Sequence, residues 1–182
     1  MKIEEVHETL KTVNALLTRE EIETLHKYAK EVPADQNIID IGTAAGTSSL
    51  TMALAGKSDV YTIDPNRNEN FIRKVEELEL TEKIYFIEKT SEKAAVDVPV
   101  NVGLLFIDGI HNYLGVMDDF GWYSDKVVKG GYIIFHDYFL YGNTIGKAVD
   151  DIVESGAVEK VEIIDSTFRK DVRTGMYVSR KL

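Results

Sequence analysis

The stretch that decides the fold runs from Asn37 to Ser48 and reads NIIDIGTAAGTS. Its first five residues are β-rich and apolar apart from Asn37 and Asp40, and a turn of small residues follows from Gly42 to Gly46. The apolar segment Leu50–Ala55 comes directly afterwards and favours a helix. A buried strand, a tight turn and a helix in direct succession are typical of the first unit of an α/β sheet. Small residues in such a turn also let a ligand approach the backbone closely.

Further strands are predicted on the C-terminal side of this unit. Helix-length segments separate four more β-rich runs, at Val60–Asp64, Ile84–Glu88, Val102–Asp108 and Tyr132–Asp137. The runs are apolar throughout rather than alternating, as the strands of a parallel sheet covered on both faces must be. Two last strand-like runs, Val158–Asp165 and Met176–Lys181, have only Ser166–Gly175 between them, which favours an antiparallel pair. We therefore expect a doubly wound, Rossmann-like α/β fold whose seven-stranded sheet is mostly parallel and carries a C-terminal antiparallel hairpin.

Helical spacing precedes the first strand. Apolar side chains recur at this spacing over residues 2–30, and Thr18 with Glu21 has the pattern of a capping box, so two lead-in helices are predicted. The 182 residues are 44% apolar and contain no Pro/Gly/Ser-rich linker. We expect one domain over 1–182, with the lead-in helices in 1–32 and the α/β core in 33–182.

Composition excludes several classes of function. The chain has no cysteine, which removes disulfides, thiolate nucleophiles and Cys-type zinc sites. Its 21 basic and 31 acidic side chains give a formal net charge of −10, which makes nucleic acid a poor partner. Neither an apolar run of about 20 residues nor a signal-peptide pattern is present, so we expect a soluble, cytoplasmic protein that does not bind membranes.

The ends of the predicted strands carry the polar residues of a candidate ligand site. In an open α/β sheet, ligands bind outside the carboxyl ends of the strands. Asp64 ends the second strand 22 residues beyond Gly42, near the ~20-residue offset at which a carboxylate binds a ribose diol. These features indicate a nucleoside cofactor, with its sugar at Asp64 and its other end over the turn 42–46. The alternative is a plain strand-to-helix turn.

The glycine pattern discriminates between two cofactors that use such a crevice. A dinucleotide fingerprint is G-x-G-x-x-G, whereas this turn reads G-x-A-x-G and lacks the third glycine. Asp40-x-Gly42-x-x-x-Gly46 resembles the first motif of the class I S-adenosylmethionine (SAM)-dependent methyltransferases, and Asp64 resembles their ribose-binding acid. The sequence departs from that pattern at Ala44, where many members have glycine.

This resemblance implies a sheet order of 3-2-1-4-5-7-6 and a set of cofactor contacts. Asp40 and Gly42 would face the methionine part, Asp64 the ribose, and Thr90 or Ser91 the adenine edge. The expected cofactor-binding residues are Asp40, Gly42, Thr43, Ala44, Gly46, Asp64, Thr90, Ser91 and Asp108.

Two carboxylates follow the fourth and fifth predicted strands. If these strands are neighbours, Asp108 and Asp137 emerge roughly 5 Å apart and repel each other unless a positive charge lies between them. A divalent metal such as Mg²⁺ meets this need, because it prefers oxygen ligands, and His136 or Asn112 would be near enough to join it. The alternative is that one carboxylate is protonated or pairs with a cation such as Lys147.

The same segments are similar to a narrower group of methyltransferases. Asp108-Gly109-x-His111-x-Tyr113 matches the D-G-x-H-x-Y sequence of the macrocin and related antibiotic-sugar O-methyltransferases (methyltransferase domain 24 type). In that group the acid matching Asp108 is a magnesium ligand and the histidine matching His111 is the general base. The resemblance therefore implies that Asp108, Asp137 and His136 bind the metal and that His111 is catalytic. His136 stands where the group has an acid.

We expect a SAM-dependent O-methyltransferase that methylates a hydroxyl of a small molecule with help from a divalent metal. The alternatives are a non-catalytic SAM- or nucleoside-binding regulatory protein and, against the glycine pattern, a nicotinamide oxidoreductase. The sequence contains no insertion long enough to form a lid over the acceptor. We therefore expect the lead-in helices or a partner subunit in a homodimer to cover the acceptor; the alternative is that it stays uncovered.

Overall fold

The computed structural model describes residues 1–13, 16–140, 144–168 and 171–182 of the chain. Its helices are α1 (Ile3–Leu10), α2 (Arg19–Glu31), α3 (Thr47–Ala55), α4 (Glu69–Glu77), α5 (Ser91–Ala94), α6 (Tyr113–Tyr123) and α7 (Thr144–Glu154), with a 3-10 turn at Ser124–Lys126. Its strands are β1 (Asn37–Ile41), β2 (Val60–Ile63), β3 (Ile84–Ile87), β4 (Val102–Ile107), β5 (Val127–Phe135), β6 (Val158–Ile164), β7 (Thr167–Phe168), β8 (Val172–Arg173) and β9 (Met176–Lys181).

Seven strands form one sheet in the order β3-β2-β1-β4-β5-β9-β6. The strands from β3 to β5 run parallel, and β9 is antiparallel to both β5 and β6. Because β9 is the seventh strand of this sheet along the chain, the predicted order 3-2-1-4-5-7-6 and the antiparallel C-terminal pair are confirmed.

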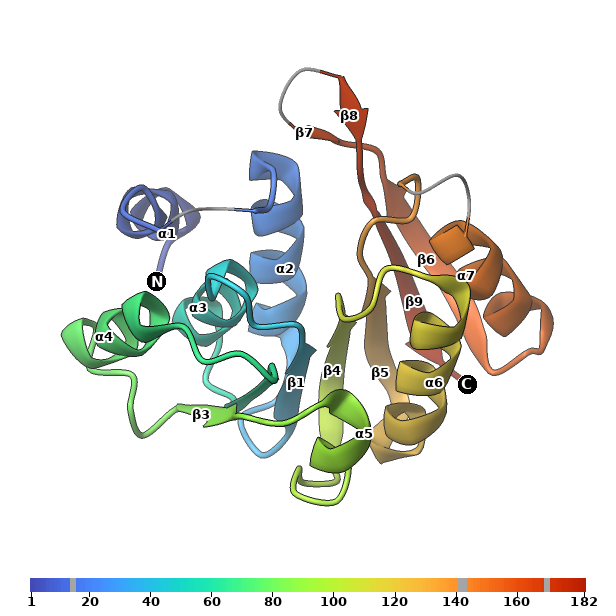
Figure 1. Cartoon of the computed structure of the whole chain (residues 1–182), viewed down its shortest axis with the longest axis horizontal. Coiled ribbons are helices and arrows are strands. Elements are labelled where there is room, and N and C mark those ends of the chain that lie inside the picture. Colours follow the sequence, from blue (N-terminus) through green and yellow to red (C-terminus); the bar gives the residue numbers. More distant parts are fainter. Residues whose placement is uncertain (14–15, 141–143, 169–170) are drawn as a thin grey trace.

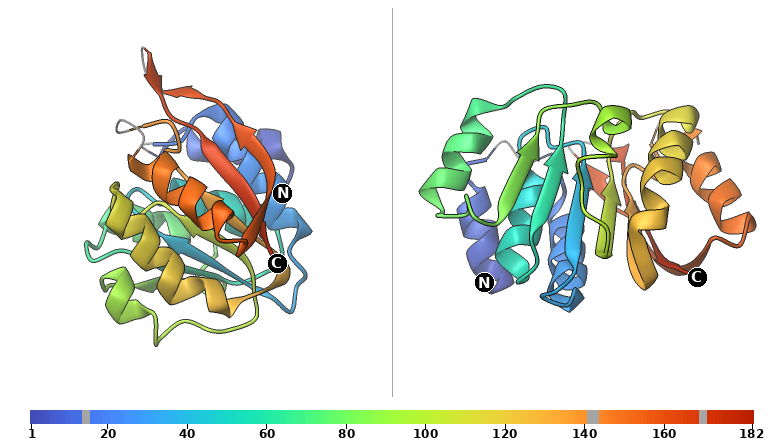
Figure 2. Two further views of the ribbon diagram at one scale, coloured as in Figure 1. Left: turned by 90° about the vertical axis from the view of Figure 1, so that its right-hand side faces the viewer. Right: turned by 90° about the horizontal axis from the view of Figure 1, so that it is seen from below.

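Helices cover both faces of the sheet, with α2 and α3 on one side and α6 and α7 on the other (Figures 1 and 2). Successive residues of a strand point to opposite faces, so Ile38 packs in the core with α1 to α4 whereas Ile39 packs in the core with α5 to α7. All six residues of β4 are buried, as an inner strand covered on both faces requires. This double coverage explains why the apolar runs identify the strands.

The lead-in segment forms the two predicted helices. Thr18 is the N-cap of α2, where its hydroxyl accepts a hydrogen bond from the Glu21 amide and the Glu21 carboxylate accepts one from the Thr18 amide, so the capping box is confirmed. α2 packs against α3, which brings the start of α2 close to the carboxyl ends of the central strands (Figure 1).

Two features differ from the predicted boundaries. β5 begins at Val127 rather than Tyr132, because the chain continues in the sheet through an irregularity at Gly130-Gly131, where the pairing with β4 shifts register. The connection between β6 and β9 contains a second, two-stranded sheet of β7 and β8, which projects beyond the main sheet next to the start of α2 (Figure 1). The described part of the chain contains no helix long and apolar enough to cross a membrane.

Candidate active site

A cavity of about 600 Å³ opens at the carboxyl ends of the parallel strands. Its lining comes from the turns after β1, β2, β4 and β5, from the start of α5, and from the connection that contains β7 and β8. The lining residues that the sequence predicted for the site are Gly42, Ala44, Asp64, Thr90, Ser91, Asp108, His111, His136 and Asp137. Strand ends and loops that are separated in sequence thus contribute to one site, as the fold class requires.

The turn after β1 is held in place by backbone geometry that favours glycine. Gly42 has a φ of +99°, and a β-carbon there would lie 2.0 Å from the backbone oxygen of Asp108. The turn therefore lies directly against the end of β4, which only a residue without a side chain permits. Ala44 also adopts a left-handed conformation, with a φ of 44°, which glycine would occupy at lower steric cost.

Asp64 faces this turn from the end of β2. Its Oδ2 accepts a hydrogen bond of 3.0 Å from the Ala44 amide and its Oδ1 accepts one of 2.8 Å from the Asn66 amide. The carboxylate is thereby fixed at the wall of the cavity. Thr90 and Ser91 line the same half of the cavity from the start of α5, after the third strand.

Asp40, at the end of β1, and Thr43 and Gly46, in the turn itself, do not line the cavity. The Oδ2 atom of Asp40 accepts hydrogen bonds from the hydroxyls of Ser48, Ser49 and Thr62, and its Oδ1 atom is buried without a hydrogen-bond partner. Burial raises the pKa of Asp40 to about 7 against these hydroxyl donors. The structure thus gives Asp40 a role in bracing the turn from below.

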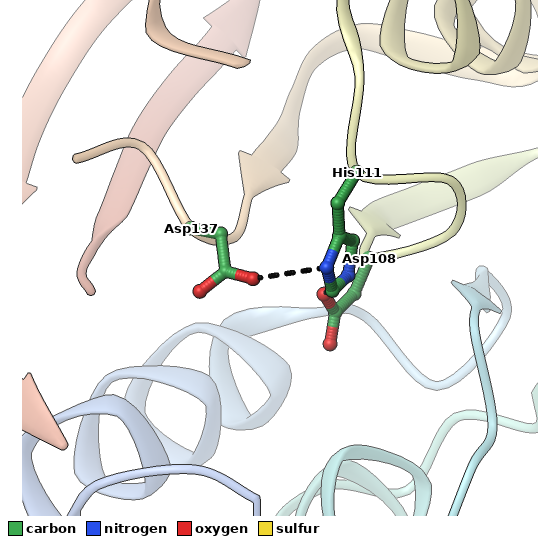
Figure 3. Close-up of side chains that lie close together, drawn as sticks. All are labelled: Asp108, His111 and Asp137. Carbon is green, nitrogen blue, oxygen red and sulfur yellow. Dashed lines mark hydrogen bonds and ion pairs between the residues drawn. The ribbon is translucent and has the colours of Figure 1, made fainter. Parts of the chain in front are cut away.

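Asp108, His111 and Asp137 converge in the other half of the cavity (Figure 3). The Nε2 atom of His111 lies 3.2 Å from Asp108 Oδ1, and its Nδ1 atom lies 3.4 Å from Asp137 Oδ2. One ligand atom from each of the three residues can be chosen so that all lie within 4.8 Å of one another. Asp137 has a φ of 56°, so the chain turns sharply after β5 and aims this carboxylate back toward His111.

His136 lies beside both aspartates of the predicted metal set, with its Nδ1 atom 3.5 Å from Asp137 Oδ1, and beside a third carboxylate. Its Nδ1 atom lies 3.0 Å from Asp108 Oδ1 and its Nε2 atom lies 3.3 Å from Oε2 of Glu21, a buried carboxylate on α2. Both ring nitrogens therefore face carboxylates, and the group with metal-ligand spacing contains His111 in place of His136. Lys147, the alternative cation, pairs with Asp151 instead of with Asp108 or Asp137.

The carboxylates of this cluster raise the pKa values of both histidines. The hydrogen bond and charge of Asp108 raise the pKa of His111. Burial alone would lower the pKa of His136, but the carboxylates of Asp108 and Glu21 raise it well above its usual value. Burial raises the pKa of Asp137. The sequence predicted a positive charge between Asp108 and Asp137. In the structure the imidazole rings of His111 and His136 lie beside these carboxylates.

Several lining residues were not identified from the sequence. They are Leu16, Ile41, Ile63, Pro65, Asn66, Gly109, Ile110, Leu140, Phe168, Val172 and Thr174. Most of them are single residues outside the quoted motifs, and such residues give no signal of a binding role. The connection between β6 and β9 also contributes to the cavity wall, which no pattern in the sequence predicts.

Comparison with known sequences finds one family and one curated relative. The model of a family described as "Methyltransferase domain" matches residues 39–138. An uncharacterized protein of Acanthamoeba polyphaga mimivirus is 32% identical over 132 residues, which are 65% of this chain and 60% of the viral protein. The match therefore spans less than two thirds of the viral protein's length.

Solved structures share the whole fold at low sequence identity. A caffeoyl-CoA O-methyltransferase-like protein of Staphylococcus aureus has a TM-score of 0.74 and 18% identity, over 100% of this chain and 93% of its own. The O-methyltransferase TomG of Streptomyces achromogenes, solved with SAM, has a TM-score of 0.73 and 15% identity, over 98% and 87%. An rRNA methylase of Streptococcus thermophilus has a TM-score of 0.71 and 16% identity, over 92% and 99%.

Proposed function

Because the chain belongs to the methyltransferase domain family, we propose that it transfers the methyl group of SAM to a hydroxyl group of a small molecule. The observation that carries this proposal is the single cavity that joins the turn at Gly42 and the carboxylate of Asp64 to the cluster of Asp108, His111 and Asp137. A donor held in the first half and an acceptor held in the second would react at the boundary between them.

The half of the cavity at β1 to β3 fits a nucleoside cofactor. Asp64 presents a carboxylate at the wall, held by two backbone amides, which suits hydrogen bonds from a ribose diol. Gly42 and Ala44 give a floor of backbone and small side chains for the methionine part, and Thr90 and Ser91 lie where an adenine edge would be. TomG, which shares the fold, was solved with SAM.

The cluster fits a divalent metal as well. Asp108 and Asp137 supply the hard oxygen donors that Mg²⁺ prefers, and we propose that these two carboxylates hold the ion. A bound divalent ion would lower the pKa of an acceptor hydroxyl that it contacts. We propose that His136 hydrogen-bonds to Asp108 and orients it rather than binding the metal.

His111 is the residue that we propose as the general base. Its ring lies between Asp108 and Asp137, with 38% of the side chain exposed, so it borders the space where an acceptor would lie. In the reaction, the acceptor oxygen bonds to the methyl carbon as the carbon–sulfur bond breaks, and His111 takes the hydroxyl proton. The products are a methyl ether and S-adenosylhomocysteine. Asp108 and Asp137 stabilise the protonated imidazole.

An oxygen acceptor on a small molecule is favoured over the main alternatives. The net charge of −10 opposes binding of an RNA backbone, although rRNA methylases share the fold. A regulatory protein that only binds SAM would have no use for an imidazole between two carboxylates beside the cofactor half. A homodimer, if it forms, would add cover to a cavity whose own walls include the β7–β8 connection.

Isothermal titration with S-adenosylhomocysteine tests this proposal. We expect one site per chain, and we expect Asp64→Ala to weaken binding by about 1 to 3 kcal/mol through the loss of a charged hydrogen bond to the ribose. Asp59→Ala, an acid just before β2 that does not line the cavity, is the matched control. A titration without heat, confirmed by equilibrium dialysis, would refute the cofactor assignment.

A further inference from the structure

The acceptor half of the cavity is walled by apolar side chains. Ile110 follows β4, Leu140 follows β5, and Phe168 and Val172 belong to β7 and β8. None of these four side chains belongs to the turn at Gly42 or to the segment around Asp64. Leu140, Phe168 and Val172 also lie outside residues 39–138, the region that the family model matches.

The connection that carries Phe168 and Val172 is fixed to this side of the molecule. The Tyr138 amide donates a hydrogen bond of 3.1 Å to the Gly175 carbonyl, just after Asp137. The buried carboxylate of Glu21 accepts hydrogen bonds from the Ser166 hydroxyl at 2.6 Å and from the Thr174 hydroxyl at 2.9 Å. Both ends of the connection are thus anchored beside β5 and His136, so β7 and β8 stand over the acceptor half.

Two of these apolar side chains are largely exposed. Ile110 is 65% exposed and Val172 is 42% exposed, and Leu16, which also lines the cavity, is 44% exposed. Large apolar side chains that gather around a cavity next to a few convergent polar groups are typical of a small-molecule site. An apolar ligand body would remove this surface from water, which favours binding.

Carboxylates outnumber the groups that can carry positive charge in the described cavity lining. Among the described lining residues, the charged groups are three aspartates and two histidines, and no lysine or arginine is present. Arg173 is the nearest cation on β8, but it is held by Asp165 at 2.7 and 2.9 Å and lies 3.7 Å over the ring of Phe139. An acidic acceptor would therefore meet carboxylates without a guanidinium or ammonium partner.

From this wall and this charge we infer that the acceptor is an uncharged hydroxyl compound with an apolar skeleton, such as an alkylphenol, whose body packs on Ile110, Leu140, Phe168 and Val172. The inference rests on the proposed function and names its substrate class. The hydroxyl points to His111, so that oxygen gains the methyl group, sulfur loses it and His111 gains the proton. This class differs from the sugars on which the macrocin group acts.

The test is calorimetric binding of three probes to the protein saturated with S-adenosylhomocysteine. 4-Propylphenol is the apolar probe, 3-(4-hydroxyphenyl)propanoate carries the same phenol with an anionic tail, and methyl glucoside is a polar hydroxyl compound. We expect 4-propylphenol to bind at least tenfold more tightly than the other two. Val172→Asp should weaken its binding at least tenfold, and Val161→Asp should leave it unchanged, because Val161 is a comparably exposed valine of β6 that does not line the cavity.

Three outcomes would overturn the inference while leaving the cofactor site intact. They are no binding of 4-propylphenol to the loaded protein, equal or tighter binding of the propanoate or the glucoside, and equal effects of Val172→Asp and Val161→Asp. Absence of S-adenosylhomocysteine binding in the first titration would instead refute the proposed function, and the acceptor inference would fall with it.

Discussion

His111 is the residue whose role separates chemistry from binding most cleanly. If it accepts the proton of the acceptor, His111→Ala should leave the affinity for S-adenosylhomocysteine within about threefold while lowering methyl transfer about 100-fold or more. Transfer is measured with methyl-labelled SAM and an alkylphenol. His7→Ala is the control, because His7 lies on α1 beside Glu23, far from the cavity. Equal loss of cofactor affinity and turnover would contradict a role as base.

Asp108 and Asp137 are expected to bind a divalent metal without His111. We predict that Asp108→Asn and Asp137→Asn each weaken Mn²⁺ binding about tenfold or more, because each removes a charged oxygen donor, whereas His111→Ala retains most of it. Electron paramagnetic resonance of free Mn²⁺ measures all three. Loss of Mn²⁺ binding in His111→Ala would make His111 a ligand and exclude it as the base.

The sequence identified these three residues because each follows directly after a predicted strand or belongs to a short motif. It did not identify the partnership of His136 with Glu21, which lie on elements far apart in the chain. The capping box of α2 already explains a glutamate at position 21. The sequence pattern therefore does not predict that Glu21 also contacts His136. Contacts between distant elements are set by packing, which a local pattern does not contain.

The turn between β1 and α3 depends on Gly42 for its shape. Gly42→Ala should destabilise the protein by about 2 kcal/mol or more, because it combines a left-handed backbone with a clash against the Asp108 carbonyl. Gly121→Ala is the matched control in α6, where a β-carbon meets nothing within 4 Å. This control should stabilise the protein by up to about 1 kcal/mol, since alanine is the better helix former. Chemical denaturation measures both, and equal effects of the two changes would contradict this account of the turn.

The junction of α2 with the β6–β9 connection depends on the charge of Glu21. Burial alone would raise the pKa of Glu21, but His136, Ser166 and the Thr18 amide lower it to about 2. A lowered pKa means that the folded state binds fewer protons, so this contribution to stability is full above the usual glutamate pKa of 4.5 and is lost as the pH falls toward 2.

Glu21→Gln should therefore reduce the free energy of unfolding at pH 7 and make it less dependent on pH between about 4.5 and 2 than in the wild type. Glu5→Gln, at an exposed acid of α1, is the control. Urea denaturation at several pH values gives the comparison. Parallel stability curves for wild type and Glu21→Gln would contradict a charged Glu21 in the folded state.

The sheet as a unit was the most predictable part of the protein. Buried parallel strands need continuous apolar runs, and their helical connections have a minimum length, so order and direction followed once the family resemblance was stated. The match over residues 39–138 confirms that resemblance. β7 and β8 were missed because strands of two residues have no periodicity, and their placement depends on anchors to Glu21 and Tyr138.

The arrangement of the complete cavity follows from the same topology. Asp64 and Asp137 follow β2 and β5, which are separated in the sheet by β1 and β4, so a ligand that contacts both ends must lie across the strand ends. We therefore expect one extended nucleoside to occupy the β1–β3 half of the cavity and to leave the half at His111 open for an acceptor.

The most direct test of this central claim is a crystal structure of the protein with S-adenosylhomocysteine. We predict that the ribose hydroxyls lie within hydrogen-bond distance of Asp64, that the adenine lies beside Thr90 and Ser91, and that the sulfur points toward the space between His111 and Phe168. An empty cavity at saturating ligand, or a nucleoside bound elsewhere on the protein, would contradict the account.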